Sequence, residues 1–419
     1  MLRTALGAGA LALAGCDTPP TEPSTVPDPS PQPPTDDETP TQTPSPTTPA
    51  PDVNRVLYAG LLDIGELASI REKVTARADP WYAGFLALMR DADRALDVAP
   101  RSVVENGAPP GVDARQFATS GVDRGDYLLA MTTSHAIRDL GLAYAFTEDD
   151  RYAEQAVALL DHWCLDSRTG MVPSGRNNGE AYFSIELHIT IPAMIYGASF
   201  VSGHLAWEAV DGGEATFREW VRAYLDDMNA GRGLDRYTGV IRNNIYAWWI
   251  LARAVAAAYL GDQNTLRIAF RDWREYAVEQ LQANGILEYE RQRDDGLSYS
   301  LYGLKALALT AELARHYDEN LYEFRTKGGT ESALRQAFAF YARFVASSDG
   351  WAWGLGEDGY TDTEREEGAS VYELAYSQWA DDAYLDAIES VGRPVNDRRI
   401  LGWTTLTHAN RFALSDADF

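Results

Sequence analysis

Two segments of the chain place amide, guanidinium and phenol groups at the start of a long apolar helix. The first, 242–249, reads Arg-Asn-Asn-Ile-Tyr-Ala-Trp-Trp, and the second, 288–302, contains Glu-Tyr-Glu-Arg-Gln-Arg and then Ser-Tyr-Ser-Leu-Tyr. Donors at the start of a helix attract anions, and a guanidinium group can bind a carboxylate through two parallel bonds. Both segments therefore suit a site that binds an acidic sugar, and neither suits a site built from paired carboxylates.

The charge balance limits the possible partners. The 419 residues include 36 basic and 62 acidic side chains, giving a net charge of −26, which argues against nucleic acid as a partner. Only three of the basic residues are lysines. A polyanion would approach this surface only where arginines cluster, or where salt screens the long-range repulsion.

The N-terminal residues have the pattern of a lipoprotein signal peptide. A basic residue, Arg3, precedes a short apolar run that ends in Leu-Ala-Gly-Cys at Cys16. We expect a signal peptide over 1–16 with Cys16 as the lipidated residue, because the apolar run is too short to span a bilayer. Cys164 then has no partner for a disulfide or a Cys-based metal site, and its apolar surroundings predict a buried thiol.

A tether and one folded domain follow the signal peptide. Residues 17–52 contain 13 of the 20 prolines and nine threonines, so we expect a disordered linker over 17–53. The folded domain is expected over 54–419. The predicted location is extracytoplasmic, on a membrane through the lipid anchor alone.

The folded domain reads as one helix after another, with apolar residues recurring at spacings of three and four, as in Ala153, Ala156, Leu159 and Leu160. Helices in about six consecutive pairs predict an all-α fold, an (α/α) toroid in the form of an incomplete barrel. Minor β pieces are expected near the C-terminus, at 350–365 and 400–406. The predicted helices are 63–77, 80–96, 126–147, 149–164, 184–206, 214–230, 244–261, 263–284, 299–317, 331–346, 369–379 and 381–392.

Several segments form a pattern by their order and spacing. They are 144–153 (YAFTEDDRYA), 160–163 (LDHW), 168–173 (RTGMVP), Asn243-Asn244, Glu290-Arg291, Tyr299 and 311–314 (AELA). Together they resemble the alginate lyase superfamily, meaning polysaccharide lyase family 5 and the related α/α-toroid uronate lyases. The similarity covers about 120–325.

The resemblance implies β-elimination at a uronic acid. A base removes the C5 proton, an acid protonates the departing C4 oxygen, and donors aimed at the carboxylate stabilise the enolate-like intermediate. By the resemblance, Asn244 and Arg291 neutralise that carboxylate and Tyr299 donates, or also accepts, the proton. A nearby guanidinium would help a phenol to ionise.

The chain departs from the family at two positions that carry histidine in relatives, where Ile245 and Ser300 stand here. Either Tyr299 is both base and acid, or a histidine comes from elsewhere, or activity has been lost. His188 is the best candidate histidine. It follows a loop, 174–179, that the family places near the substrate and that makes Arg176 a candidate substrate contact.

Each of these residues also has a structural interpretation. Asn243 and Asn244 could cap a helix, and both Tyr299 and His188 could lie in the core. Arg291 could form a surface ion pair with Glu288 or Asp294. Adjacent Trp248 and Trp249 point about 100° apart on a helix, so they cannot both face one site. Further candidate substrate-binding residues are Arg242, Asn243, Tyr246, Trp248 and Tyr302.

Three functions remain open from the sequence. The first is a lyase that acts on an acidic polysaccharide such as alginate or a glucuronan. The second is an α/α-toroid glycoside hydrolase, which needs two carboxylates roughly 5 to 10 Å apart. The third is a glycan-binding lipoprotein without activity. We expect no metal, no cofactor and a monomer. The carboxylates available to a hydrolase are Glu186, Glu288, Glu290, Asp294 and Asp295.

Overall fold

The protein is described by a computed structural model that defines residues 57–105, 107, 125–174, 185–230, 242–326 and 328–410. The chain divides into two compact units, 1–50 and 51–419, and all of the described residues lie in the second unit. Cys16, the tether and Arg176 are outside the described residues.

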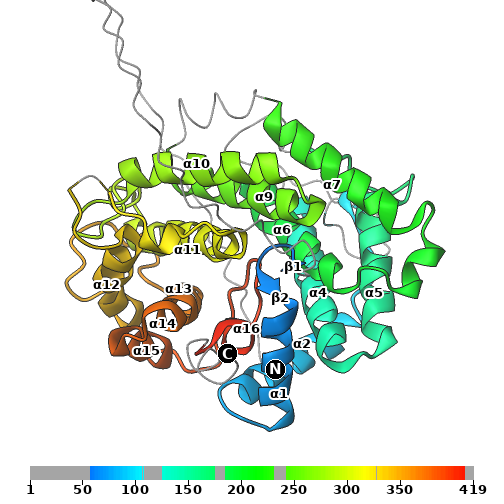
Figure 1. The fold of residues 1–419 in the computed structure, drawn as a ribbon, viewed down its shortest axis with the longest axis horizontal. Helices are drawn as coiled ribbons and strands as arrows, with labels where there is room; N and C mark the ends of the chain where they lie inside the picture. The colour runs from blue at the N-terminus through cyan, green and yellow to red at the C-terminus, as the bar shows by residue number, and fades with distance from the viewer. Residues whose placement is uncertain are drawn as a thin grey trace, which may run out of the picture. The chain divides into compact units, whose positions relative to one another are not determined.

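Four helices are buried on almost every side and form the inner layer of the second unit. They are α4 (Gly125–Thr147), α6 (Ile185–Phe200), α9 (Asn244–Leu260) and α11 (Gly296–Ala314). Each packs on the next in chain order, α4 on α6, α6 on α9 and α9 on α11 (Figure 1). Because these sequences are apolar around the whole helix, only a position with neighbours on all sides suits them.

The outer helices have one apolar stripe and one polar face. They are α5 (Asp150–Leu160), α7 (Gly213–Asn229), α10 (Gln263–Gln280) and α12 (Ala333–Ala346). Helix α5 covers α4 and α6, α7 covers α9, α10 covers α9 and α11, and α12 covers α11. This pairing of inner and outer helices confirms the predicted (α/α) toroid.

The first and last elements meet. Helix α16 (Thr404–His408) packs on α2 (Trp81–Ala95), on α1 (Ile64–Thr75) and on α14 (Tyr372–Trp379), and α15 (Asp382–Glu389) packs on α12 and α14. Shorter turns of helix are Val103–Glu105, Asp161–Leu165, Leu205–Ala209, Arg315–Tyr317 and Leu321–Glu323.

The predicted positions of the β pieces were wrong. The described sheet is an antiparallel pair at the start of the domain, β1 (Leu57–Tyr58) with β2 (Leu62–Asp63), in which Leu57 pairs with Asp63. Helix α13 (Asp362–Ser370) occupies the end of the 350–365 segment, and α16 occupies part of 400–406. Thr361 starts α13 by exchanging hydrogen bonds with Glu364 in a capping box.

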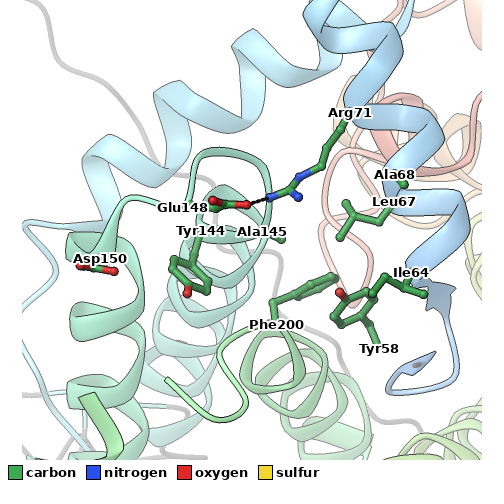
Figure 2. Close-up of a pocket in the computed structure, with 10 residues that line it drawn as sticks. All are labelled: Tyr58, Ile64, Leu67, Ala68, Arg71, Tyr144, Ala145, Glu148, Asp150 and Phe200. Carbon is green, nitrogen blue, oxygen red and sulfur yellow. Dashed lines mark hydrogen bonds and ion pairs between the residues drawn. The ribbon is translucent and has the colours of Figure 1, made fainter. Parts of the chain in front are cut away.

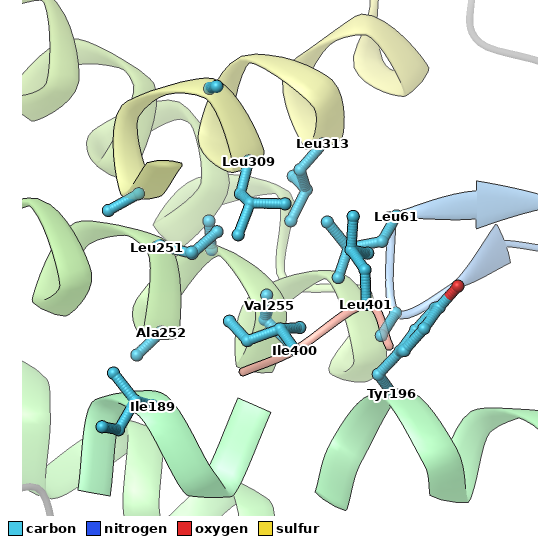
Figure 3. Close-up of a cluster of buried hydrophobic side chains, with 14 of the residues drawn as sticks. Leu61, Ile189, Tyr196, Leu251, Ala252, Val255, Leu309, Leu313, Ile400 and Leu401 are labelled. Atoms are coloured by element: carbon cyan, nitrogen blue, oxygen red, sulfur yellow. The ribbon is translucent and has the colours of Figure 1, made fainter. Parts of the chain in front are cut away.

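Side chains fill the space between the inner helices. Figure 3 shows Leu251 and Val255 of α9 and Leu309 of α11 around Ile400 and Leu401, which come from the C-terminal segment. Helices α4 and α6 approach most closely at glycines, since a Cβ atom added at Gly141 would lie 2.3 Å from the Gly197 carbonyl oxygen. None of the described helices is both long enough and apolar enough to cross a bilayer.

Candidate active site at the mouths of two inner helices

Asn244 is the first residue of α9, and two of its groups bind the buried carboxylate of Glu290. Its backbone N–H donates to Oε1 of Glu290, and its side-chain Nδ2 donates to Oε2 at 3.1 Å. Gln280, the last residue of α10, donates to Oε1 at 3.3 Å. Glu290 therefore fixes both the start of α9 and the orientation of the Asn244 amide.

Arg293 connects this carboxylate to Tyr299. Its Nη1 lies 3.6 Å from Oε2 of Glu290, and its guanidinium carbon lies 3.5 Å from the centroid of the Tyr299 ring. Gly303 is one turn after Tyr299, and a Cβ atom added there would lie 3.5 Å from Cβ of Asn244. Because residues i and i+4 share a helix face, Tyr299 stands on the face of α11 that passes Asn244.

Arg291 has different neighbours. Its Nε and Nη2 donate to the two carboxylate oxygens of Glu288 at 3.0 and 2.8 Å, and its guanidinium lies 5.4 Å from the Trp353 ring centroid. The ion pair with Glu288 that the sequence allowed is therefore present. The guanidinium that lies on Tyr299 belongs to Arg293, two residues further along the chain.

Burial raises the pKa of Glu290 from its ordinary value near 4.5 to about 7. The positive charge of Arg293 and the two hydrogen bonds from Asn244 lower this pKa, but they do not cancel the cost of removing the charged carboxylate from water. The carboxylate therefore changes its charge near neutral pH, where few glutamates do.

A second group of charged side chains lies at the same end of the inner helices, and we call Lys305, Glu367, Asp397 and Arg399 the Arg399 cluster. Nε and Nη2 of Arg399 donate to the two carboxylate oxygens of Glu367. Nζ of Lys305 lies 3.0 Å from Oδ1 of Asp397 and 3.7 Å from Oε1 of Glu367. The four groups thus form a charge-balanced set of two cations and two anions.

Aromatic rings join this cluster to the start of α9. The Tyr302 ring lies 4.8 Å from the Trp248 ring and 5.4 Å from the Arg399 guanidinium, and Nη1 of Arg399 also donates to the Tyr127 hydroxyl at 3.4 Å. Tyr127 lines a cavity of about 210 Å³ between the first turns of α4 and α6, together with Glu186. A chain of rings and guanidinium groups therefore runs from Asn244 toward this cavity.

His188 lies on α6, fully buried, with Nδ1 3.3 Å from the Tyr224 hydroxyl of α7. Burial lowers the pKa of His188 to about 3, so the imidazole is neutral at any ordinary pH. A group with so low a pKa is a weak general base.

The other predicted residues take separate positions. Asn243 caps α9 by accepting from the Ile245 N–H, and Arg242 pairs with Glu279 at 2.9 Å. Trp248 and Trp249 are both buried and face different sides, Trp248 toward Tyr302 and Trp249 toward Tyr246. Tyr246 also packs on Tyr276 of the outer helix α10, on the side of α9 away from Tyr302.

Sequence reasoning missed the roles of Glu290, Arg293 and Arg399. In the sequence, Glu290 belongs to the Glu290-Arg291 segment of the family resemblance and is one of the carboxylates available to a hydrolase, but neither pattern indicates that it binds Asn244. Its partner Asn244 is 46 residues away in the chain, and Arg399 is 272 residues from Tyr127. The arginine-rich run 291–293 was the one local signal for Arg293.

A larger hollow of about 460 Å³ lies elsewhere, beside the C-terminal ends of α4 and α6. Figure 2 shows Arg71 of α1 reaching toward Glu148, with Tyr144, Tyr58 and Phe200 around the opening. Nη2 of Arg71 donates to Glu148 at 3.0 Å, so this guanidinium is already paired. None of the predicted site residues that the structure describes lines this hollow.

The fold is that of an α/α-toroid polysaccharide lyase, and comparison with known proteins supports this class. The sequence matches the family described as Alginate lyase over residues 89–351, so the chain belongs to the alginate lyase family. No curated protein matches the chain significantly.

Solved structures of alginate lyases share the fold at low sequence identity. A structure of an alginate lyase from Bacteroides ovatus has a TM-score of 0.67 and 20% identity, over 82% of this chain and 97% of that chain. Alginate lyase A1-III from Sphingomonas species A1 has a TM-score of 0.61 and 15% identity, over 84% and 95%. A variant of A1-III complexed with a tetrasaccharide has a TM-score of 0.63 and 16% identity, over 85% and 97%.

Proposed function

We propose that the protein is a polysaccharide lyase that cleaves a uronate-containing polysaccharide, alginate first among them, by β-elimination. Family membership gives the reaction class. The observation that carries the proposal is that four residues contact one another near the N-terminal ends of α9 and α11, namely Asn244, Glu290, Arg293 and Tyr299. A related enzyme has been solved with a bound tetrasaccharide, which supports an acidic oligosaccharide as the ligand.

The proposed mechanism assigns a part to each group. The Asn244 amide and a guanidinium donate to the uronate carboxylate, so that the negative charge that develops when C5 loses its proton is stabilised. The resemblance gives the guanidinium role to Arg291, and the stacking on Tyr299 gives it to Arg293. Tyr299 takes the C5 proton as a phenolate and returns a proton to the C4 oxygen, which leaves as the C4–O bond breaks.

The position of this site suits an anionic substrate. The N-terminal ends of α9 and α11 direct backbone N–H groups and the positive end of each helix dipole toward it. The chain as a whole repels a polyanion, with a net charge of −26. We therefore expect cleavage to be faster at moderate salt than at very low salt, because salt screens the repulsion at long range more than the contacts in the site.

The test is an incubation of the protein with a panel of polyuronates, followed by the ultraviolet absorbance of the unsaturated product. Cleavage with rising absorbance supports elimination, and new reducing ends without absorbance would show hydrolysis instead. Tyr299→Phe should abolish the absorbance change. The matched control is Tyr317→Phe, which removes a hydroxyl just beyond the other end of α11.

We further propose that the protein is an extracytoplasmic lipoprotein anchored through Cys16, and that it acts as a monomer. The support is the signal-peptide pattern that ends at Cys16 and the proline-rich tether after it. Cys16→Ser should move the protein from the membrane fraction to the soluble fraction. Retention of the variant in the membrane fraction would contradict the anchor.

A further inference from the structure

We propose that Glu290 is a positioning residue for the elimination, and that its ionised carboxylate fixes the Asn244 amide and the Arg293 guanidinium toward the substrate. The inference rests on the proposed lyase function and deepens it. It predicts that activity follows the protonation of a glutamate that does not itself touch the substrate.

The hydrogen-bond partners of Glu290 favour the ionised form of its carboxyl group over the protonated form. Its oxygens accept from the backbone N–H and Nδ2 of Asn244 and from Nε2 of Gln280, and Nη1 of Arg293 lies 3.6 Å away. All four groups are donors, and an ionised carboxylate is an acceptor only, with about four lone-pair directions. A protonated carboxyl group would place its own O–H among these donors and lose at least one bond.

The same contacts orient Asn244. Because Nδ2 points to Glu290, the Oδ1 atom and the second N–H of the amide cannot also point there. Without the carboxylate, the amide could rotate by 180° at little cost and present Oδ1 where a donor is required. Such a rotated amide would repel a uronate carboxylate instead of neutralising it.

The surroundings of Glu290 contain one full positive charge. The groups that face it are Asn244 on α9, Gln280 and the Tyr276 phenol on α10, the Tyr341 phenol on α12, and Arg293 on the turn before α11. The phenols are neutral near neutral pH, since burial raises the pKa of Tyr341 to about 12 and holds the pKa of Tyr276 well above its ordinary value. Arg293 alone is not enough to cancel the effect of burial, so the pKa of Glu290 is about 7.

Catalysis should therefore have an acid limb near pH 7 that belongs to Glu290. Below it, the carboxyl group is protonated and the amide and guanidinium lose their fixed positions. The folded-state pKa lies above the unfolded value near 4.5, so this carboxyl contributes stability below pH 4.5 that is lost as the pH rises through 7. The form that positions Asn244 is thus the less stable one, which separates the expected effects on activity and on folding.

The experiment compares wild type, Glu290→Gln and the control Glu275→Gln on a polyuronate that wild type cleaves. Glu275 is an exposed carboxylate on α10 and gives the same change of charge. Glu290→Gln should lower kcat by about a hundredfold with a much smaller change in KM. It should also lose the part of the acid limb near pH 7, while the part that comes from ionisation of Tyr299 remains. Its melting temperature at alkaline pH should equal or exceed that of wild type, and the control should match wild type in every measurement.

A second variant moves the acid limb without removing the carboxylate. Gln280→Met takes away one donor to the charged form, so the limb should shift to higher pH while kcat on the alkaline plateau stays within a few-fold of wild type. Wild-type kcat and an unmoved acid limb in Glu290→Gln would overturn the inference. Absence of elimination by wild type on every polyuronate would instead overturn the proposed function.

Discussion

Glu290 and Glu367 are carboxylates removed from water, Glu290 completely and Glu367 largely, and their pKa values move in opposite directions. The pKa of Glu290 is raised to about 7, whereas the positive charges of Arg399 and Lys305 hold the pKa of Glu367 below its ordinary value despite burial. The pKa of Asp397, in the same cluster, is also lowered, by the positive charge of Lys305 and by hydrogen bonds from the N–H groups of Ile400 and Leu401.

The exposed fractions of the two side chains differ little, 0% for Glu290 and 15% for Glu367, whereas their partners differ in charge. The Glu367 carboxylate accepts two hydrogen bonds from one guanidinium group and lies beside an ammonium group. The Glu290 carboxylate accepts from neutral amide donors, and its one cationic neighbour, Arg293, lies at 3.6 Å. Amide donors orient a carboxylate without cancelling the cost of its charge, while two cations cancel most of it. The Arg399 cluster is therefore suited to hold the ring of helices together, and the Glu290 site is suited to respond to pH.

The largest effect on folding should come from unbalancing the Arg399 cluster. Lys305→Met leaves Asp397 as a buried anion that has lost its cation, and such changes cost about 3–5 kcal/mol of unfolding free energy. Chemical denaturation measures the loss. The control is Lys73→Met on α1, which lies outside the cluster and should change stability by less than about 1 kcal/mol. Equal losses of stability for Lys305→Met and Lys73→Met would show that the Arg399 cluster contributes no more to the unfolding free energy than a lysine outside it.

The pH dependence of stability should have opposite signs at the two sites. Glu290 contributes stability that is lost as the pH rises from about 4.5 through 7, by up to about 3 kcal/mol. Glu367 and Asp397 contribute stability that is present above their unfolded values and lost as the pH falls through their lowered folded values. Melting curves recorded over this range should show that Glu290→Gln removes the first dependence and leaves the second.

Glu367→Gln should have the converse result. The loss of stability at acid pH should be smaller than in wild type, and the change of stability near neutral pH should be the same. If both variants altered the same part of the curve, the two carboxylates would be titrating as one coupled system.

The two neighbouring arginines should differ in activity. Arg293→Met removes the guanidinium that contacts both Glu290 and Tyr299, and should lower kcat/KM by about a hundredfold. Arg291→Met breaks an ion pair with Glu288 and should cost less than about tenfold. The reverse order of effects would return the neutralising role to Arg291, as the family resemblance implies, and would require that arginine to turn away from Glu288 when substrate binds.

The sequence was sufficient for most of the helices because most of them have a strong local pattern. The observed α9 and α10 begin at the predicted residues, and the caps that start them, Asn243 and Asp262, are visible in the sequence. Helix α13 escaped prediction because Asp362–Ser370 is mostly charged and has no apolar stripe. Only the Thr361–Glu364 capping box marks its start.

The site was predictable only in part. Asn244 and Tyr299 were found through the family resemblance, and the structure brings their helices together. Arg399 has no local signal, because nothing in its own segment indicates that closure of the ring places it beside Tyr127 and Tyr302. The pKa of Glu290 is raised because the residue is buried, and its burial cannot be read from the sequence.

The smallest effect expected at the Glu290 site is that of Gly303→Ala, and it separates packing from positioning. The added Cβ would lie 3.2 Å from a methyl group of Leu287, which can move, and 3.5 and 3.6 Å from Asn244 and Glu290. Alanine favours the helix over glycine by up to about 1 kcal/mol, which offsets the crowding, so the melting temperature should hardly change. Activity should stay within a few-fold of wild type, because 3.5 and 3.6 Å are ordinary van der Waals distances and leave the Asn244–Glu290 pair in place. A larger fall in kcat at unchanged stability would mean that the amide tolerates no displacement. The requirement at this site would then include the position of Glu290 as well as its charge.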